Sequence, residues 1–257
     1  MRYPIRGELR QTTTGKMQLL EEPRLLTNRD RRHVLLVDLD GTLTDPAEGI
    51  VGCFRFALEA LGQTAPSAAD LTWIIGPPLR RSFAGLLGPS GDAEAALAIY
   101  RSRYAAQGIF EATVYNGVRE ALSAFNEAGT RLILCTAKPQ VYADRILERF
   151  DLARHFAAAH GAELDGRLED KGDLIAHILV EHALDPGDCV MWGDRKHDVV
   201  AARRHRIPTI GALWGYGGES ELRAAGAAAL CAAPREVPAI FGGFPRAEAR
   251  VRTPPHD

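Results

Sequence analysis

The alternation of apolar and polar positions divides the first half of this chain into one strand and a series of helices. Residues 34–37 are uniformly apolar, as in a parallel strand covered on both faces. Apolar residues then recur at steps of three and four from Ile50 to Leu61, which predicts a helix that ends at Gly62. The same pattern predicts short helices over residues 68–75, 79–87 and 92–106.

In the second half, strands and helices alternate regularly. After a helix at 118–128, strands are predicted at 131–135, 156–159 and 189–192, with a last strand at 209–212. Helices are predicted between and after them, at 141–150, 172–182 and 196–206. This alternation predicts an α/β fold with a doubly wound parallel sheet.

The spacing of the first two strands indicates an insertion. A βαβ unit needs about 30 residues, yet 93 residues separate Asp38 from Arg131. The excess predicts an inserted α-helical cap at 48–113, within a core formed by 33–47 and 114–241. Residues 1–32 are polar and basic, and residues 242–257 are rich in proline, so both are predicted to be flexible extensions.

Composition limits the classes of binding partner and the cellular compartment that we expect. A net charge of −2 gives no electrostatic footprint for a nucleic-acid polymer or an acidic membrane. No apolar run approaches the ~18 residues of a membrane span. The four cysteines lack the spacing of metal ligands and are expected to be reduced core residues, which predicts a cytoplasmic protein. No pattern predicts an oligomeric state.

The first strand ends on a pair of carboxylates. Asp38 and Asp40 lie two residues apart, so in an extended chain their side chains point to the same side. Gly41 permits a tight turn, and the carboxyl end of a parallel strand is where α/β folds bind ligands. Two carboxylates that cannot pair with each other require a cation or a division of roles, so we expect a catalytic site here.

Three further segments place polar groups at similar positions. Thr136 follows the strand at 131–135, Lys171 precedes a helix, and Asp194 follows the strand at 189–192 with Asp198 four residues later. A turn threonine, a solvated lysine and a helix N-cap at Asp194 are the alternatives. Three more polar residues are expected only at a solvated helix start: Arg195, Lys196 and His197.

Taken in this order, the four segments resemble the motifs of the haloacid dehalogenase-like hydrolase superfamily. The first is an apolar strand followed by Asp-x-Asp-Gly-Thr, the second a Ser or Thr, the third a Lys, and the fourth Gly-Asp with a second acidic residue. The resemblance covers about residues 33–230. It implies a Rossmann-like core with the α-helical cap of the first subclass.

The resemblance also implies roles for individual residues. Asp38 is the implied nucleophile, Asp40 the acid and base, and Thr136 and Lys171 stabilise the transferred phosphoryl group. A Mg²⁺ ion is implied at Asp38, the backbone carbonyl of Asp40 and Asp194, with Asp198 supporting it or ligating through water. Further residues are expected to contact the substrate: Gly41, Thr42, Ala137, Lys138, Arg80 and Arg81.

The cap and two loops indicate a branch of this superfamily. Gly76-Pro77-Pro78-Leu79-Arg80-Arg81 resembles the phosphoglycolate phosphatase and nucleotidase branch, as do residues 44–46 and 214–217. This predicts a magnesium-dependent phosphatase acting on a small phosphorylated metabolite, phosphoglycolate phosphatase-like. The alternatives are a 5'-nucleotidase or pyrophosphatase, a sugar phosphomutase, and a non-catalytic receiver-like or scaffold module.

Overall fold

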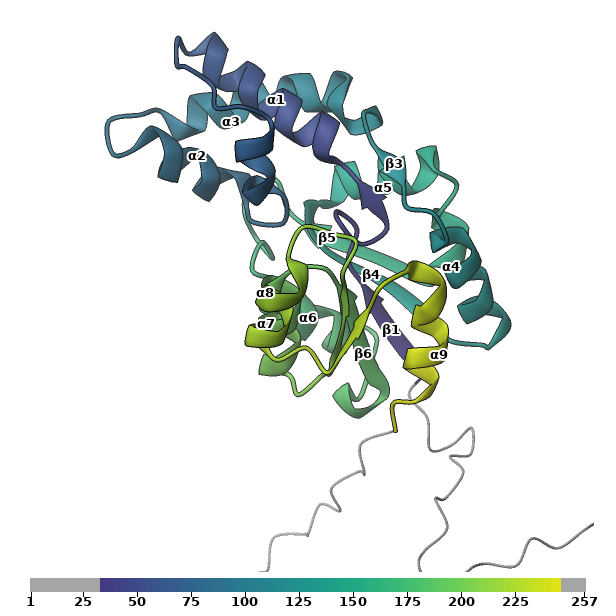
Figure 1. Cartoon of the computed structure of the whole chain (residues 1–257). Helices are drawn as coiled ribbons and strands as arrows, with labels where there is room; N and C mark the ends of the chain where they lie inside the picture. The colour runs from purple at the N-terminus through teal and green to yellow at the C-terminus, as the bar shows by residue number, and fades with distance from the viewer. Residues whose placement is uncertain (1–32, 246–257) are drawn as a thin grey trace, which may run out of the picture.

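The computed structural model describes residues 33–245, and a parallel sheet of six strands lies at their centre (Figure 1). The strand order is β5-β4-β1-β6-β7-β8. Their bounds are Val34–Val37 for β1, Arg131–Pro139 for β4, Ala158–Ala162 for β5, Cys189–Gly193 for β6, Thr209–Ala212 for β7 and Ala229–Cys231 for β8. β1 is central because it pairs with both β4 and β6.

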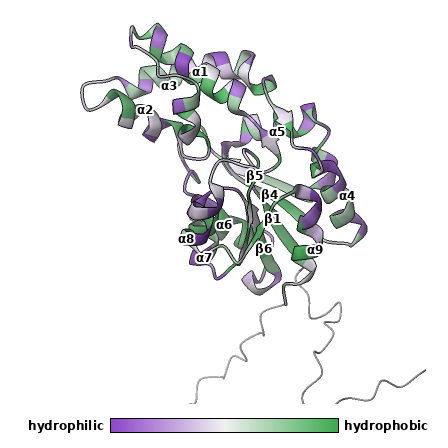
Figure 2. Ribbon diagram, viewed as in Figure 1, coloured by the Kyte–Doolittle hydropathy of each residue, from purple (hydrophilic) through white to green (hydrophobic). Residues whose placement is uncertain are grey.

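Two layers of helices cover the sheet. Side chains of β1 alternate between the layers, so Leu35 packs with Phe125 on one face and Leu36 with Ile175 on the other. The strands are therefore apolar on both sides (Figure 2). The first layer holds α4 (Val118–Glu127), α5 (Gln140–Arg149) and α9 (Val237–Gly242); the second holds α6 (Lys171–Glu181), α7 (Lys196–Arg204) and α8 (Gly218–Ala225). The predicted doubly wound α/β fold is confirmed.

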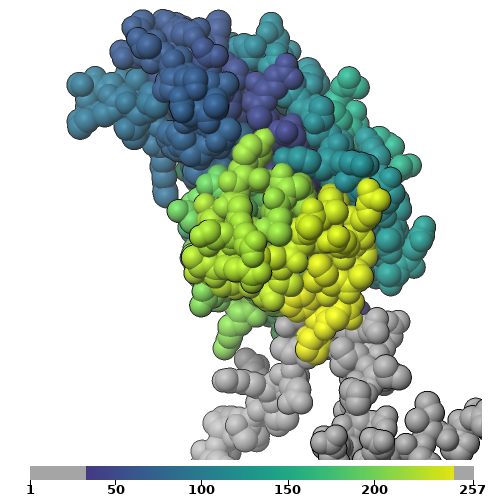
Figure 3. Space-filling view, viewed as in Figure 1, coloured from purple at the N-terminus to yellow at the C-terminus, as the bar shows by residue number. Residues whose placement is uncertain are grey.

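A third group of helices lies beyond the carboxyl end of the sheet (Figures 1 and 3). It contains α1 (Ala47–Ala60), α2 (Leu79–Leu87) and α3 (Ala93–Ala106), with 3₁₀ turns at Ala69–Ile74 and Gly108–Phe110. These helices share an apolar centre, where the rings of Phe54 and Phe83 stack with centroids 3.9 Å apart. We call residues 47–110 the cap.

The junction of cap and core contains two strands that the sequence did not predict. β2 (Thr44–Asp45) and β3 (Thr113–Val114) form an antiparallel pair at the two points where the chain enters and leaves the cap. A strand of two residues shows no periodicity, so only the pairing reveals it.

Other boundaries also differ from the predictions. β7 is not the last strand, because β8 adds to the sheet edge, and β5 starts at Ala158 rather than Phe156. The predicted 1–32 extension and residues 246–257 of the predicted tail lie outside the described residues. Phe244, in the described part of that tail, packs against the core. Between residues 33 and 245, no helix is long and apolar enough to cross a membrane.

Candidate active site

The site lies at the carboxyl end of β1, between the neighbouring ends of β4 and β6. Asp38 directly follows β1, Thr136 lies in β4, and Asp194 directly follows β6. Because these three strands are adjacent and parallel, their ends bring the three buried side chains together. A cavity is lined by residues of both the core and the cap. Its lining includes the core residues Asp38, Asp40, Thr136, Ala137, Lys138 and Lys171 and the cap residues Tyr100 and Tyr104.

Lys171 joins two of the carboxylates. Its Nζ lies 2.7 Å from Asp38 Oδ1 and also donates to Asp198 Oδ1. Burial opposes the charged ammonium, yet the two carboxylates raise the pKa of Lys171, so the side chain is protonated. Asp170 caps helix α6 by accepting from two backbone N–H groups, and this cap fixes Lys171 as the first residue of the helix.

Asp194 is held from two sides. Its Oδ2 accepts from the Tyr216 N–H at 2.8 Å, and its Oδ1 accepts from Thr42 Oγ1 at 3.4 Å. Gly41, with φ of +85°, lies so close that an added methyl group would overlap the Asp194 carboxylate. Gly41 and Thr42, expected to bind substrate, therefore contact Asp194 instead of lining the cavity.

The buried charges of the site fit a divalent cation. Oxygens of Asp38, Asp194 and Asp198 lie within 4.8 Å of one another. Burial, and then the repulsion of Asp198 and Asp38, raises the pKa of Asp194; burial likewise raises that of Asp38. With Asp40, four buried carboxylates lie together, and among residues 33–245 their ion pairs are with Lys138 and Lys171 alone. A Mg²⁺ ion would balance the remaining charge with the oxygen ligands it prefers.

Lys138 is buried beside Asp40, and Lys171 is buried too, which excludes a solvated lysine at that position. Its Nζ lies 2.8 Å from Asp40 Oδ2 and donates to the Tyr104 hydroxyl of α3, also at 2.8 Å. Burial raises the pKa of Asp40 although Lys138 opposes the shift. Asp40 Oδ1 is buried and has no hydrogen-bond partner among the described residues. A buried carboxyl with a raised pKa suits proton transfer.

Arg195 corrects the expectation of a solvated helix start. Lys196 and His197 are exposed as expected, but Arg195 is only 8% exposed. Its guanidinium donates to the Ile75 carbonyl of the cap, and its Nε donates to Glu221 at 2.9 Å. The sequence offers no signal for this contact, because Ile75 lies 120 residues away.

Arg80 and Arg81, the cap arginines expected to contact the substrate, differ in position. Arg80 lines the cavity that contains Asp38, and it pairs with Glu94 of α3. Arg81 lies instead in a neighbouring groove lined by Lys196 and Arg204. Two contacts of this region were not predicted from the sequence: that of Tyr104 with Lys138 and that of Arg195 with Ile75.

The fold and the site together define an α/β enzyme with a helical cap over a carboxylate-rich cavity. The chain belongs to the haloacid dehalogenase-like hydrolase family, whose family model matches residues 35–212.

The chain is similar to relatives that are named for different activities. A 5'-nucleotidase of Pseudomonas aeruginosa is 43% identical over 74% of this chain and 86% of its own length. A phosphoglycolate phosphatase of Agrobacterium fabrum is 30% identical over 74% of this chain and 84% of its own length. The tyrosine-protein kinase PtkA of Mycobacterium tuberculosis is 40% identical over 72% of this chain, which covers 63% of PtkA.

Solved structures agree with this assignment. A predicted phosphatase from Clostridium acetobutylicum superposes with a TM-score of 0.77 and 36% identity, over 82% of this chain and 97% of that chain. The predictions of a haloacid dehalogenase-like phosphatase, a phosphoric monoester hydrolase, and of its phosphoglycolate phosphatase and nucleotidase branch are confirmed at this level.

Proposed function

We propose that this protein is a magnesium-dependent phosphatase that hydrolyses a small phosphomonoester through an aspartyl-phosphate on Asp38. The observation that carries the proposal is one cavity lined by Asp38, Asp40 and Lys171 of the core and by tyrosines of the cap. Such a cavity binds a small phosphorylated metabolite and shields it from water. We further propose that the cap acts as a lid, since it attaches through β2, which begins four residues after Asp40.

The first half-reaction transfers the phosphoryl group to the protein. A carboxylate oxygen of Asp38 forms a bond to phosphorus while the ester P–O bond breaks, and its electron pair stays on the departing alcohol oxygen. Asp40 donates its proton to that oxygen; burial raises the pKa of this carboxyl and so favours the protonated form. Lys171, 2.7 Å from Asp38, and the Thr136 hydroxyl stabilise the phosphoryl oxygens.

The second half-reaction restores Asp38. The Asp40 carboxylate takes a proton from a water molecule, whose oxygen attacks phosphorus as the bond to Asp38 breaks. Phosphate leaves, Asp38 is again a carboxylate, and Asp40 is again protonated. Lys138, 2.8 Å from Asp40, stabilises the intermediate stage in which Asp40 is charged.

Asp38, the backbone carbonyl of Asp40 and Asp194 would hold a magnesium ion, which would supply positive charge beside the phosphoryl oxygens. Asp198 accepts from Lys171 at one oxygen and from the Arg195 N–H at the other, at 2.9 Å. We therefore assign Asp198 to the positioning of Lys171 and to support of the ion.

The residues that line the cavity indicate which class of substrate suits it. Among its cap residues are several apolar and aromatic side chains: Ile50, Ile74, Leu79, Leu97 and Tyr100. Phosphoglycolate is small and carries a second anion, whereas both cap arginines that line the cavity already have partners: Arg80 pairs with Glu94, and Arg101 donates to the Leu164 carbonyl. The apolar wall suits a nucleobase, so a 5'-nucleotidase, the activity named for the Pseudomonas relative, is the second candidate beside a phosphoglycolate phosphatase.

The test is phosphate release from a panel of phosphoglycolate, nucleoside monophosphates, sugar phosphates and pyrophosphate, with and without magnesium. We expect magnesium-dependent turnover and one preferred compound. Asp38→Asn should abolish turnover, whereas Asp144→Asn, on the exposed side of α5, should leave it unchanged. Residual turnover in Asp38→Asn would exclude the nucleophile, and absence of any release would favour a phosphomutase or a non-catalytic role.

A further experiment tests whether the protein transfers a phosphoryl group to a protein acceptor. Because one relative is named a tyrosine-protein kinase, ATP with a tyrosine-containing acceptor belongs in the panel. We expect water to be the acceptor, and labelled phosphotyrosine would contradict this. We also propose a cytoplasmic location, since all four cysteines are buried in the core, as reduced cysteines usually are.

A further inference from the structure

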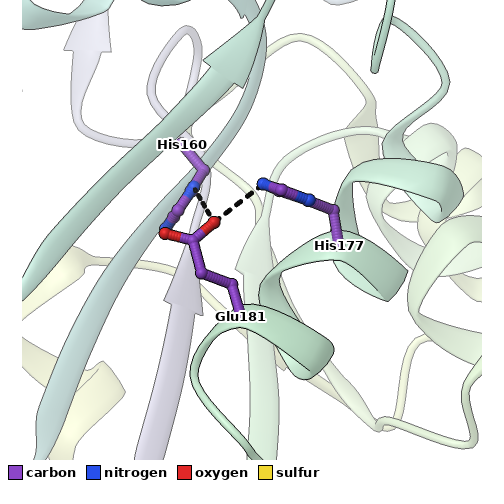
Figure 4. A group of neighbouring side chains, drawn as sticks. All are labelled: His160, His177 and Glu181. Atoms are coloured by element: carbon purple, nitrogen blue, oxygen red, sulfur yellow. Dashed lines mark ion pairs between the residues drawn. The ribbon is translucent and has the colours of Figure 1, made fainter.

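A second group of potential metal ligands lies away from the catalytic carboxylates. It consists of His160 on β5 and of His177 and Glu181 on α6, which converge on one point (Figure 4). His177 and Glu181 are four residues apart and therefore share one face of the helix. The catalytic proposal assigns no role to any of the three.

The distances between the ligand atoms bracket the spacing that a tetrahedral ion requires. His177 Nε2 lies 2.8 Å from Glu181 Oε2, and His160 Nδ1 lies 4.0 Å from the same oxygen. One ligand atom from each residue lies within 4.8 Å of the others. Metal–ligand bonds of about 2.0–2.2 Å place tetrahedral ligands roughly 3.4 Å apart. Small side-chain adjustments therefore bring all three to an ion and leave a fourth position for water.

His160, the least exposed of the three ligands, also has an outer partner. The His160 side chain is 13% exposed, and its other nitrogen, Nε2, lies 2.8 Å from His182 Nε2. Arg131 lies 2.9 Å from His182 Nδ1 and can only donate there, which fixes the neutral His182 with its proton on Nε2. A metal-bound histidine usually donates its second N–H to a partner that orients the ring, so His182 must become an acceptor when His160 binds an ion.

The chemistry of the donors selects the ion. Two imidazoles and one carboxylate suit zinc and its neighbours in the first transition row, whereas Mg²⁺ prefers oxygen ligands alone. His177 lies six residues after Lys171, which is about 9 Å along α6. This cluster and the catalytic carboxylates therefore form two separate places with different preferences.

We propose that His160, His177 and Glu181 form a binding site for a zinc-class transition-metal ion that joins strand β5 to helix α6. The ion bridges two elements that flank the active site, since β5 leads into cavity residues Ala162 and Glu163 and α6 begins with Lys171. Binding at His160 Nδ1 releases the proton of that nitrogen to solvent and leaves the ring proton of neutral His160 on Nε2. His182 Nε2 then accepts this hydrogen bond only if the His182 proton moves to Nδ1 and Arg131 withdraws from that atom.

The test is calorimetric titration of the full chain, without a polyhistidine tag, with zinc chloride in excess magnesium, which occupies the catalytic carboxylates. We expect one zinc ion per chain. His177→Ala and Glu181→Ala, both at half-exposed positions where folding should persist, should each weaken binding at least about 10-fold. His33→Ala, at an exposed histidine outside the cluster, is the matched control and should bind normally.

A thermal unfolding measurement gives an independent readout. Because zinc binds the folded state, it should raise the unfolding midpoint of the wild-type chain and not that of His177→Ala. Unchanged zinc affinity in both cluster variants would overturn the proposal, as would absence of zinc uptake in excess magnesium. Zinc binding that disappears in Asp194→Asn but survives in His177→Ala would place the ion at the catalytic carboxylates and also overturn it.

Discussion

Lys138 Nζ donates a hydrogen bond of 2.8 Å to the hydroxyl of Tyr104 and thereby connects the partner of Asp40 to the cap. The ammonium also lies 4.7 Å from the centre of the Tyr104 ring. Burial raises the pKa of Tyr104 to about 12, so its hydroxyl stays protonated. The position of the cap helix α3 and the electrostatics of Asp40 are therefore coupled through a single lysine.

Lys138→Met should remove the charge that balances Asp40. We expect kcat/KM to fall by about 100-fold or more, because the pKa of Asp40 is then no longer matched to its proton transfers. Tyr104→Phe removes only the hydroxyl and should cost less than about 10-fold. Steady-state kinetics of the two variants measures the difference. Equal losses would show that the contact with the cap, and not the charge, matters at this position.

Arg195→Met should loosen the cap. The substitution keeps an apolar stem but removes the hydrogen bond to Ile75 and leaves Glu221 without that partner. We expect faster proteolysis and faster amide exchange over residues 69–76, with a loss of about 1–3 kcal/mol in unfolding free energy. Lys196→Met, at the exposed neighbouring position, is the control. Identical protection in the two variants would refute the link.

Gly41→Ala should destabilise the protein through backbone strain and should, in addition, disrupt the metal site. The residue has φ of +85°, and its added methyl group would overlap Asp194. Gly62→Ala is the matched control, since φ is +72° there and no atom lies within 4 Å of the added carbon. Both should lose about 1–3 kcal/mol from backbone strain. Only Gly41→Ala should also lose magnesium-dependent activity.

The effect of magnesium on stability should grow with pH. Burial raises the pKa of Asp194 and Asp38 above the ordinary value of 3.8, so the folded state binds more protons than the unfolded state. Stability of the metal-free protein therefore falls as pH rises from about that value through the raised folded-state pKa. Thermal unfolding at several pH values, with and without magnesium, measures this. A magnesium-induced increase that shrinks with rising pH would contradict it.

Asp194→Asn should stabilise the metal-free protein while abolishing its activity. The amide can accept from the Tyr216 N–H and donate to Thr42 Oγ1, so both hydrogen bonds persist without the charge. Relief of repulsion from Asp38 and Asp198 should add at least about 1 kcal/mol to the free energy of unfolding. Denaturant unfolding in the presence of a chelator tests this, and a destabilised variant would indicate that the carboxylate itself is structurally required.

The sequence by itself determined the elements and the residues whose positions depend on local pattern. The apolar run before Asp38, the two-residue spacing to Asp40 and the strand before Asp194 place their side chains at strand ends, because backbone geometry sets the side on which each residue points. Helices α1, α2 and α3 were predictable from their apolar periodicity, and the spacing of 93 residues between Asp38 and Arg131 indicated an insertion.

Only the tertiary structure decided which groups meet across long separations. Arg195 reaches Ile75 over 120 residues, Lys138 reaches Tyr104 over 34, and the β2–β3 pair forms from residues that carry no periodic signal. His160 likewise meets His177 and Glu181 only because β5 packs beside α6. Local preferences of the backbone cannot report such contacts, because their energy comes from packing and charge pairing that exist only once the chain has folded.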